Sequence, residues 1–324
     1  ILIGSLFIFK IMGNFGMFSN EIMKKIKKLL AVFAAVSVAL MLPLQTMAAV
    51  DLNAKYDIST NQIQGWPAGP DITSDTGILM DADTGVILYN KGGDEQRYPA
   101  SITKVMTALV VLEHCNLNDT VTFSETATTN LESGAVALGV SAGDQLTVEQ
   151  SLYGLLLKSA NEIGNGLAEH VSGSVSAFAD LMNAKAKELG CKNTHFVNPH
   201  GLNNENHKTT PYDMALILRA AVANDTFRKI DTTTSYEFPA IKNAAAHTIT
   251  MGHKMMYKTD SRYYEGIIGG KTGYTSKAGN TLVTAVERDG VRLIAVVMKA
   301  KGTHYTDTKA MLDYGFQLHA AGKI

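Results

Sequence analysis

Short apolar segments separated by turn residues predict strands at both ends of the main body of the chain. Residues 77–80 and 86–89 flank an Asp-Ala-Asp-Thr-Gly segment, a pattern typical of a β-hairpin. Near the C-terminus, residues 281–286 and 291–298 flank Asp289-Gly290, which favours a second hairpin turn. Two hairpins far apart in the sequence are therefore expected.

A helical pattern dominates the region between these hairpins. After Pro99, apolar residues recur from Ile102 to Leu112 with the spacing of one helical face, so an amphipathic helix is expected to begin near Ser101. Residues 147–189 are also helical in pattern, with an interruption at Ser159. A helix–turn–helix arrangement is therefore expected there.

Two more helices are expected over residues 211–224 and 306–318. Because strands at both ends enclose a helical middle, the sheet must be assembled from distant segments and should be largely antiparallel. The predicted fold class is α+β, an antiparallel sheet flanked by helices with a helical lobe.

Composition and charge restrict the function classes. The 324-residue chain is 46% apolar and 18% charged, as expected of a folded globular domain. Its net charge is −1, but residues 1–48 hold five lysines and one acid, which leaves a net charge of −5 for the remainder. This mildly acidic remainder has no Lys/Arg cluster, which excludes a nucleic-acid partner.

Residues 23–48 have the pattern of a secretory signal peptide. Four lysines between positions 24 and 28 precede an apolar run over residues 29–44 and then small residues, so cleavage is expected after Ala48 or Ala49. The run is shorter than the ~20 residues that span a bilayer, which favours a cleaved signal over a membrane anchor. Either interpretation exports the body, to the extracellular space, the cell wall or the periplasmic face of the membrane.

The remaining boundaries follow from this signal. Residues 1–22 are interpreted as an upstream start-site artefact or a disordered extension. Residues 49–70 contain glycines and prolines typical of a linker, and residues 71–320 form the single folded domain. The membrane is expected to be a partner only transiently, through the signal peptide.

Three short patterns follow one another along the chain: Ser101-Ile102-Thr103-Lys104, Ser159-Ala160-Asn161 and Lys271-Thr272-Gly273. A single S-x-x-K or S-x-N arises by chance about once in a chain of this length, whereas K-T-G is expected in roughly one chain in ten. The joint presence of the three patterns therefore carries the functional argument.

Ser101 and Lys104 suit nucleophilic catalysis. Residues three apart share a helical face, so the Lys104 ammonium can reach Ser101 Oγ. A serine hydroxyl is a weak nucleophile until a neighbour takes its proton, and Lys104 can do so only when burial or a second cation such as Lys271 makes it neutral. Alone, the two would be interpreted as a helix N-cap and a solvated lysine; the other two patterns favour the catalytic interpretation.

The other two patterns are expected at the edges of the same cleft. Ser159 and Asn161 fall at the break between two predicted helices, where they either cap a helix or protrude into the cleft. Lys271-Thr272-Gly273 follows Gly269-Gly270 and is expected to begin a strand, because Gly273 allows a close backbone approach. A substrate strand could then dock there by edge pairing; the alternative is an ordinary glycine-rich turn.

The chain resembles the low-molecular-weight penicillin-binding proteins that are D-alanyl-D-alanine carboxypeptidases, of the β-lactamase/transpeptidase-like superfamily. The resemblance covers about residues 70 to 320 and rests on residues 98–104, 159–162, 198–202 and 271–279. It implies a serine hydrolase that removes the terminal D-alanine from peptidoglycan pentapeptide stems, with β-lactam antibiotics as covalent inhibitors. It implies neither a cofactor nor a metal.

The resemblance also implies roles for individual residues. Ser101 would attack the penultimate D-alanine carbonyl, Lys104 would accept its proton, and Ser159 would relay a proton to the leaving amine. The implied substrate-binding residues are Asn161, Lys271, Thr272, Gly273 and Tyr274, with the backbone N–H groups of Ser101 and Tyr274 as the oxyanion hole.

The chain departs from the family pattern in two respects, and two rival functions stay open. The chain stops at Ile324, without the β-rich domain and membrane anchor of many relatives, and His304 stands where relatives often place an arginine. A serine β-lactamase would share the three patterns, but no Glu between Asn161 and Lys271 has an Asn four residues later. A non-catalytic penicillin-sensing module is disfavoured by the intact Ser101, Lys104 and Lys271.

Cysteines and histidines give weaker signals. Cys115 and Cys191 are expected to be buried free thiols, and neither lies in a metal-ligand spacing. His195, His200 and His207 crowd one segment, but without a zinc-binding motif. For His200, both a structural role in a turn and a catalytic role remain possible.

Overall fold

The computed structural model describes residues 65–129, 131–132 and 134–324. The predicted signal peptide, the segment before it and most of the predicted linker lie outside the described residues. Within the described part of the chain, no helix is long and apolar enough to cross a membrane.

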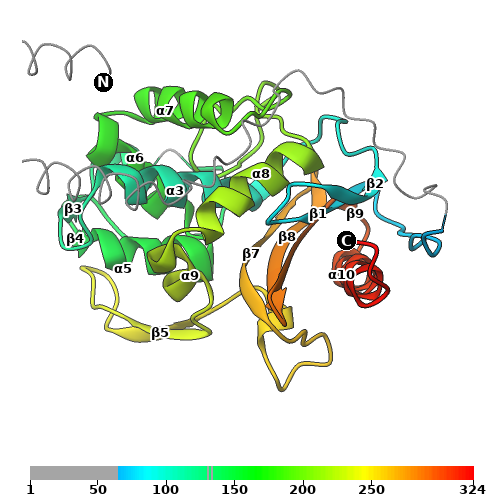
Figure 1. Cartoon of the computed structure of the whole chain (residues 1–324). Coiled ribbons are helices and arrows are strands. Elements are labelled where there is room, and N and C mark those ends of the chain that lie inside the picture. Colours follow the sequence, from blue (N-terminus) through cyan, green and yellow to red (C-terminus); the bar gives the residue numbers. More distant parts are fainter. Residues whose placement is uncertain (1–64, 130, 133) are drawn as a thin grey trace, which may run out of the picture. The chain divides into compact units, whose positions relative to one another are not determined.

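One five-stranded antiparallel sheet organises the described domain (Figure 1). Its order is β2 (Ile87–Lys91), β1 (Thr76–Asp81), β9 (Val291–Ala300), β8 (Gly279–Arg288) and β7 (Ile267–Thr275). Leu79 pairs with Tyr89 within the first hairpin and Ile78 pairs with Val296 across the two ends of the chain. Both predicted hairpins and the antiparallel, long-range assembly are confirmed.

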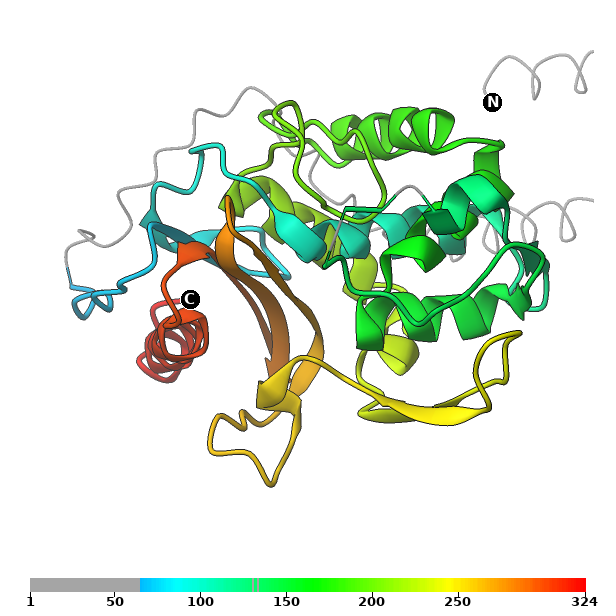
Figure 2. The ribbon, with the colours of Figure 1, turned by 180° about the vertical axis from the view of Figure 1, so that it is seen from behind.

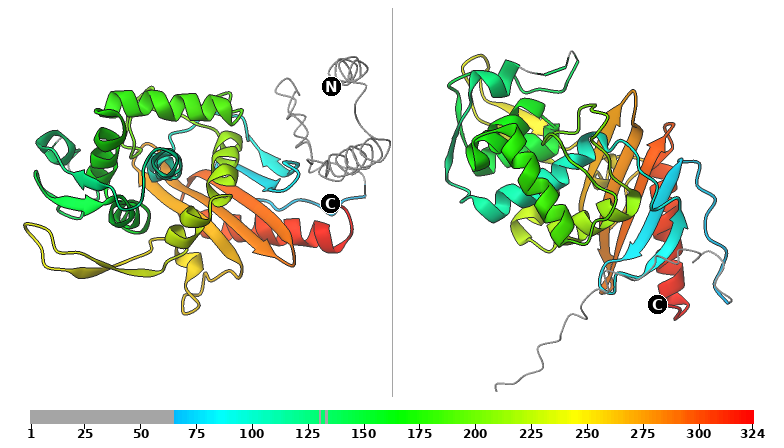
Figure 3. Two further views of the ribbon diagram at one scale, coloured as in Figure 1. Left: turned by 60° about the vertical axis from the view of Figure 1, so that its left-hand side comes forward. Right: turned by 90° about the horizontal axis from the view of Figure 1, so that it is seen from above.

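Both faces of the sheet are buried, which explains the nearly continuous apolar run of β9. Alternate side chains along a strand point to opposite faces: Ile294 and Val296 join the core beneath the helical lobe, whereas Leu293 and Val297 face α10 (His304–Ala320). The view from above in Figure 3 shows α10 on one side of the sheet and the lobe on the other. The α+β fold class is confirmed.

The helical lobe supplies the other wall of the domain. Its longer helices are α3 (Lys104–His114), α6 (Asn161–Ser172), α7 (Val175–Glu188) and α8 (Pro211–Val222), joined by the shorter α4 (Glu125–Thr129), α5 (Val148–Tyr153) and α9 (Asp225–Asp231). The two-stranded sheet of β3 and β4 (Thr120–Thr122, Gln145–Thr147) and the β5–β6 hairpin (Ser235–Phe238, His247–Thr250) complete it. Figure 2 shows the β5–β6 hairpin along the lobe, where Tyr236 stacks on Tyr153 of α5 with ring centroids 3.8 Å apart.

Two predicted boundaries are wrong in ways that shape the site. Ser101 does not begin the α-helix: it lies in a 3₁₀ turn, Ala100–Thr103, and α3 begins at Lys104. Gly269-Gly270 is not a turn before the strand but part of β7, where an added Cβ on Gly270 would lie 2.6 Å from the Val283 carbonyl oxygen. Gly270 therefore permits close strand packing, and Gly269 permits close approach of α8 and α9, rather than chain reversal.

Candidate active site

Ser101 and Lys104 lie where the 3₁₀ turn joins α3. Ala100 takes a positive φ of 52° before Ser101, and Gly201 packs so closely that an added Cβ would lie 1.8 Å from the Ala100 carbonyl oxygen. Thr281 also donates a 2.8 Å hydrogen bond to the Pro99 carbonyl. Strain of this kind is typical of functional sites, and it fixes the backbone that carries Ser101.

Lys104 is positioned as a base for Ser101. Its Nζ lies 3.1 Å from Ser101 Oγ and donates to Asn161 Oδ1 at 2.8 Å and to the His200 carbonyl at 2.7 Å. The side chain is fully buried. Burial, with the positive charge of Lys271 second, holds the pKa of Lys104 well below its ordinary value, which favours the neutral amine that a base requires.

Ser159 and Asn161 lie at the predicted break between helices, at the end of a π-helical turn, Gly154–Lys158. Ser159 adopts the left-handed conformation with φ 66°, and its buried hydroxyl has no hydrogen-bond partner among the described residues. Asn161 begins α6, and its Nδ2 donates to the Val136 carbonyl. Neither side chain caps the helix: Ala160 is the N-cap residue and makes no side-chain bond.

Lys271 lies on β7, the edge strand of the sheet, and is 2% exposed. Burial lowers the pKa of Lys271 to about 8, although the nearby carboxylate of Asp231 acts in the opposite direction. Asp231 is fully buried and accepts a 2.6 Å hydrogen bond from the Gly270 N–H. Because Asp231 ends α9, far from any motif, sequence reasoning gave no signal for this partner.

Gly273 brings β7 against the nucleophile. A Cβ at this position would lie 2.7 Å from the Ser101 backbone nitrogen and 2.4 Å from Thr281 Oγ1. The next residue, Tyr274, is 67% exposed at the sheet edge, and Thr272 is half-buried and gives its carbonyl to Lys271 Nζ at 3.0 Å. The structure therefore places all three sequence patterns around one point.

The histidines of the loop after α7 are used as structural hydrogen-bonding groups. His207 is buried; its Nε2 pairs with Thr103 Oγ1 at 2.9 Å and its Nδ1 accepts from the Val197 N–H. His200 Nδ1 accepts from the Leu202 N–H, and burial holds the pKa of His200 well below its ordinary value. Both ring nitrogens of His207 are therefore engaged in hydrogen bonds.

His304 is the first residue of α10 and is half-buried, with its ring centroid 4.3 Å from that of Tyr305. Burial, followed by the charge of Arg262, lowers the pKa of His304. The two cysteines are free as expected, but each is only partly buried.

The chain is similar in sequence to known proteins. A family model described as D-alanyl-D-alanine carboxypeptidase matches residues 63–302. D-alanyl-D-alanine carboxypeptidase DacF of Bacillus subtilis is 35% identical over 246 residues, which are 74% of this chain and 61% of DacF. DacB2 of Mycobacterium tuberculosis, with the same description, is 37% identical over 271 residues, 80% of this chain and 89% of DacB2.

Solved structures show the same fold. The D-alanyl-D-alanine carboxypeptidase of Mycobacterium tuberculosis matches with a TM-score of 0.71 and 35% identity, over 79% of this chain and 95% of that one. The DD-transpeptidase of Streptomyces K15 matches with a TM-score of 0.71 and 32% identity, over 78% of this chain and 100% of that one. The chain therefore belongs to the D-alanyl-D-alanine carboxypeptidase family and is a serine hydrolase of that type with the DD-peptidase fold.

Proposed function

We propose that this chain removes the terminal D-alanine from peptidoglycan pentapeptide stems through an acyl-enzyme on Ser101. The observation that carries the proposal is the 3.1 Å hydrogen bond between Ser101 Oγ and the buried amine of Lys104. A hydroxyl beside a base with a depressed pKa is the arrangement that activates a serine nucleophile.

In acylation, Ser101 Oγ attacks the carbonyl carbon of the penultimate D-alanine, and its proton passes to Lys104 Nζ. The oxyanion accepts hydrogen bonds from the backbone N–H groups of Ser101 and Tyr274, which the contact at Gly273 keeps close together. Collapse of this intermediate breaks the C–N bond. Ser159, with its buried and unpartnered hydroxyl, gives its proton to the nitrogen of the departing D-alanine and takes up the proton held by Lys104 Nζ, which leaves Lys104 neutral for deacylation.

In deacylation, water attacks the ester carbonyl while Lys104 accepts a proton from the water. The ester bond breaks, the proton returns to Ser101 Oγ, and the shortened stem peptide leaves with a new carboxylate. The same oxyanion site serves both steps. Because Ser101 has regained its proton, the enzyme returns to its starting state.

The outer edge of β7 offers a docking place for the stem peptide. β7 has a sheet partner on only one side, so its free backbone groups can pair with an extended peptide. Lys271 supplies positive charge for the substrate carboxylate, Thr272 contacts that carboxylate, and Asn161 hydrogen-bonds the peptide backbone. β-Lactams would acylate Ser101 in the same place.

The export signal proposed over residues 23–48 brings the enzyme to this substrate. Peptidoglycan lies outside the cytoplasm, so cleavage after Ala48 or Ala49 would release the catalytic domain on the side where stem peptides are found.

The function is tested by D-alanine release from a peptide ending in D-alanyl-D-alanine, with the full chain and its Ser101→Ala variant. The same peptide ending in L-alanyl-L-alanine is the matched control. We expect release only from the D,D-peptide, and a loss of at least about 10³-fold in the variant. No release alongside a lasting penicillin adduct would instead indicate a sensor, and penicillin hydrolysis faster than D-alanine release would indicate a β-lactamase.

A further inference from the structure

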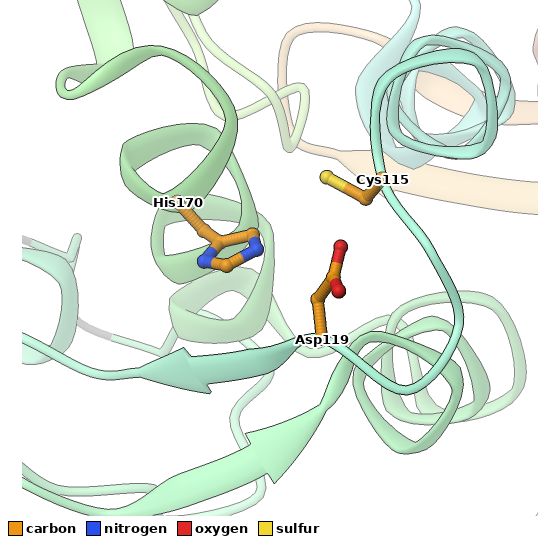
Figure 4. A group of neighbouring side chains, drawn as sticks. All are labelled: Cys115, Asp119 and His170. Atoms are coloured by element: carbon orange, nitrogen blue, oxygen red, sulfur yellow. The ribbon is translucent and has the colours of Figure 1, made fainter.

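Cys115, Asp119 and His170 form a cluster away from the active site, shown in Figure 4. One ligand atom of each residue lies within 4.8 Å of the ligand atoms of the other two. At about 1.5 Å per helical residue, Cys115 lies about 16 Å from Lys104 along α3. The cluster is therefore separate from the catalytic residues.

Three backbone elements hold the cluster in place. Cys115 is the C-cap residue of α3, and its N–H bonds to the Val111 carbonyl at 3.0 Å. His170 lies in the last turn of α6. Asp119 closes a turn in which its Oδ2 accepts from the Asn116 N–H at 2.7 Å.

The atoms that could bind a ligand are left uncommitted. Within the described residues, no hydrogen bond engages Asp119 Oδ1, the Cys115 sulfur or the His170 ring. Cys115 and Asp119 are partly buried, whereas His170 is exposed, so solvent can reach one side of the cluster. That open side leaves room for a water as a further ligand.

The local field favours a cation at this point. α3 ends at His114 and α6 at Ser172, so the negative ends of two helix dipoles meet at the cluster. The carboxyl group of Asp119 lies beside these two helix ends. A divalent ion would neutralise this field and displace the thiol proton.

We propose that Cys115, Asp119 and His170 bind a divalent zinc-like metal ion, with water as the fourth ligand. Thiolate, imidazole and carboxylate form a donor set that suits Zn²⁺. Zinc–ligand distances of about 2.0–2.3 Å place tetrahedral ligand atoms roughly 3.3–3.8 Å apart, so small side-chain rotations would close the site.

The ion would act on structure rather than on the reaction. α3 begins at Lys104 and α6 begins at Asn161, so a metal joining their C-terminal ends holds together the two helices that present catalytic groups at their N-termini. The sequence gives no motif for this site, because the ligands are separated by four and then fifty-one positions and meet only through the packing of α3, α6 and the turn before β3.

The test uses the full chain, reduced and freed of metal, and titrated with Co²⁺. A tetrahedral cobalt site with a thiolate ligand gives visible ligand-field bands and a near-ultraviolet sulfur-to-metal charge-transfer band. We expect both bands in the wild type, their loss when one equivalent of Zn²⁺ is added, and a Tm that rises with free Zn²⁺. Absence of the charge-transfer band in the wild type would overturn the proposal.

Variants assign the ligands. Cys115→Ser should abolish the charge-transfer band, and His170→Ala and Asp119→Asn should each weaken Co²⁺ binding at least about tenfold. Asp119→Asn keeps an acceptor for the Asn116 N–H, so it separates metal binding from the structure of the turn. Cys191→Ser is the matched control and should bind as the wild type does; a band that persists in Cys115→Ser or disappears in Cys191→Ser would refute the assignment.

Penicillin acylation verifies that each variant is folded. Ser101 lies in the 3₁₀ turn before α3, at the other end of that helix from the cluster, so every variant should still react with penicillin at 25 °C. Loss of metal binding together with retained acylation supports the proposal, and loss of the charge-transfer band in every variant, the Cys191→Ser control included, contradicts it.

Discussion

At the residue scale, two buried lysines are given different protonation states by their neighbours. Lys104 lies in the field of Lys271, which adds to the effect of burial and lowers its pKa, whereas Lys271 has Asp231 nearby to retain its charge. Environments that separate the pKa values of two groups are a mark of acid–base chemistry. Lys104 is therefore suited to accept a proton and Lys271 to attract a carboxylate.

This difference predicts a bell-shaped dependence of kcat/KM on pH. Activity rises with pH as Lys104 becomes neutral, and it falls above about pH 8 as Lys271, whose pKa is about 8, loses its charge. The alkaline fall should appear mainly in KM, because the proposed role of Lys271 is to attract the substrate carboxylate. Steady-state kinetics across the pH range measure both limbs.

Two variants should shift the alkaline fall of kcat/KM in opposite directions along the pH scale. Lys271→Arg keeps its charge at every accessible pH, so the fall should disappear. Asp231→Asn removes the charge that raises the pKa of Lys271, while the amide oxygen can still accept from the Gly270 N–H, so the limb should move to lower pH. An alkaline limb that stays in place in both variants would assign it to another group.

Removal of the Ser159 hydroxyl should affect activity and stability differently. Its hydroxyl is buried without a partner among the described residues, so Ser159→Ala should leave the free energy of unfolding unchanged or higher. The same variant should lower kcat by about 10²–10⁴-fold, because proton transfer to the leaving amine is lost. Denaturant unfolding and single-turnover kinetics measure the two effects.

Ser159→Gly and Ser151→Ala complete this comparison. Glycine relieves the cost of the left-handed conformation at φ 66°, about 1–2 kcal/mol for other residues, so Ser159→Gly should be at least as stable as Ser159→Ala and equally inactive. Ser151, on α5, also has a buried and unpartnered hydroxyl, but Ser151→Ala should retain full activity. Equal activity losses at the two positions would remove the proton-transfer role of Ser159.

At the scale of elements, β7 and the 3₁₀ turn lie so close together that no side chain at residue 273 would fit between them. The nearest atoms to an added Cβ on Gly273 belong to Thr281 and to the Ser101 backbone. The sequence predicted the strand but placed its start too late, because Gly-Gly normally ends a strand. It did not show the 3₁₀ turn or the π-helical turn either, since both depend on packing between distant segments.

Gly273→Ala should therefore displace β7 from Ser101 and disrupt the oxyanion site. We expect acylation by penicillin to slow by about 10²–10³-fold, the usual effect of losing one oxyanion donor. Gly164→Ala is the matched control on α6, since its added Cβ would have no neighbour closer than 3.5 Å. Stopped-flow acylation rates compare the two, and a Gly273→Ala rate within about twofold of the control rate would count against the steric argument.

At the scale of the whole molecule, the candidate site lies where the sheet edge meets the helical lobe. Ser101, Ser159 and Lys271 come from segments far apart in the sequence, and short motifs identified them because their spacing within each motif is local. Asp231 and Thr281 could not be identified in this way, because each acts across the fold on a partner with no fixed spacing. The sequence therefore predicted the candidate catalytic groups better than the groups that hold them in place.

The site of the covalent bond formed with penicillin tests whether Ser101 is the nucleophile. The full chain is incubated with the antibiotic, digested, and the modified peptide is identified by mass spectrometry, with the Ser101→Ala variant as the control. We expect one adduct per chain, on the peptide that contains Ser101, and none in the variant. An adduct on another residue, or an adduct that survives Ser101→Ala, would contradict the assignment of Ser101 as the nucleophile.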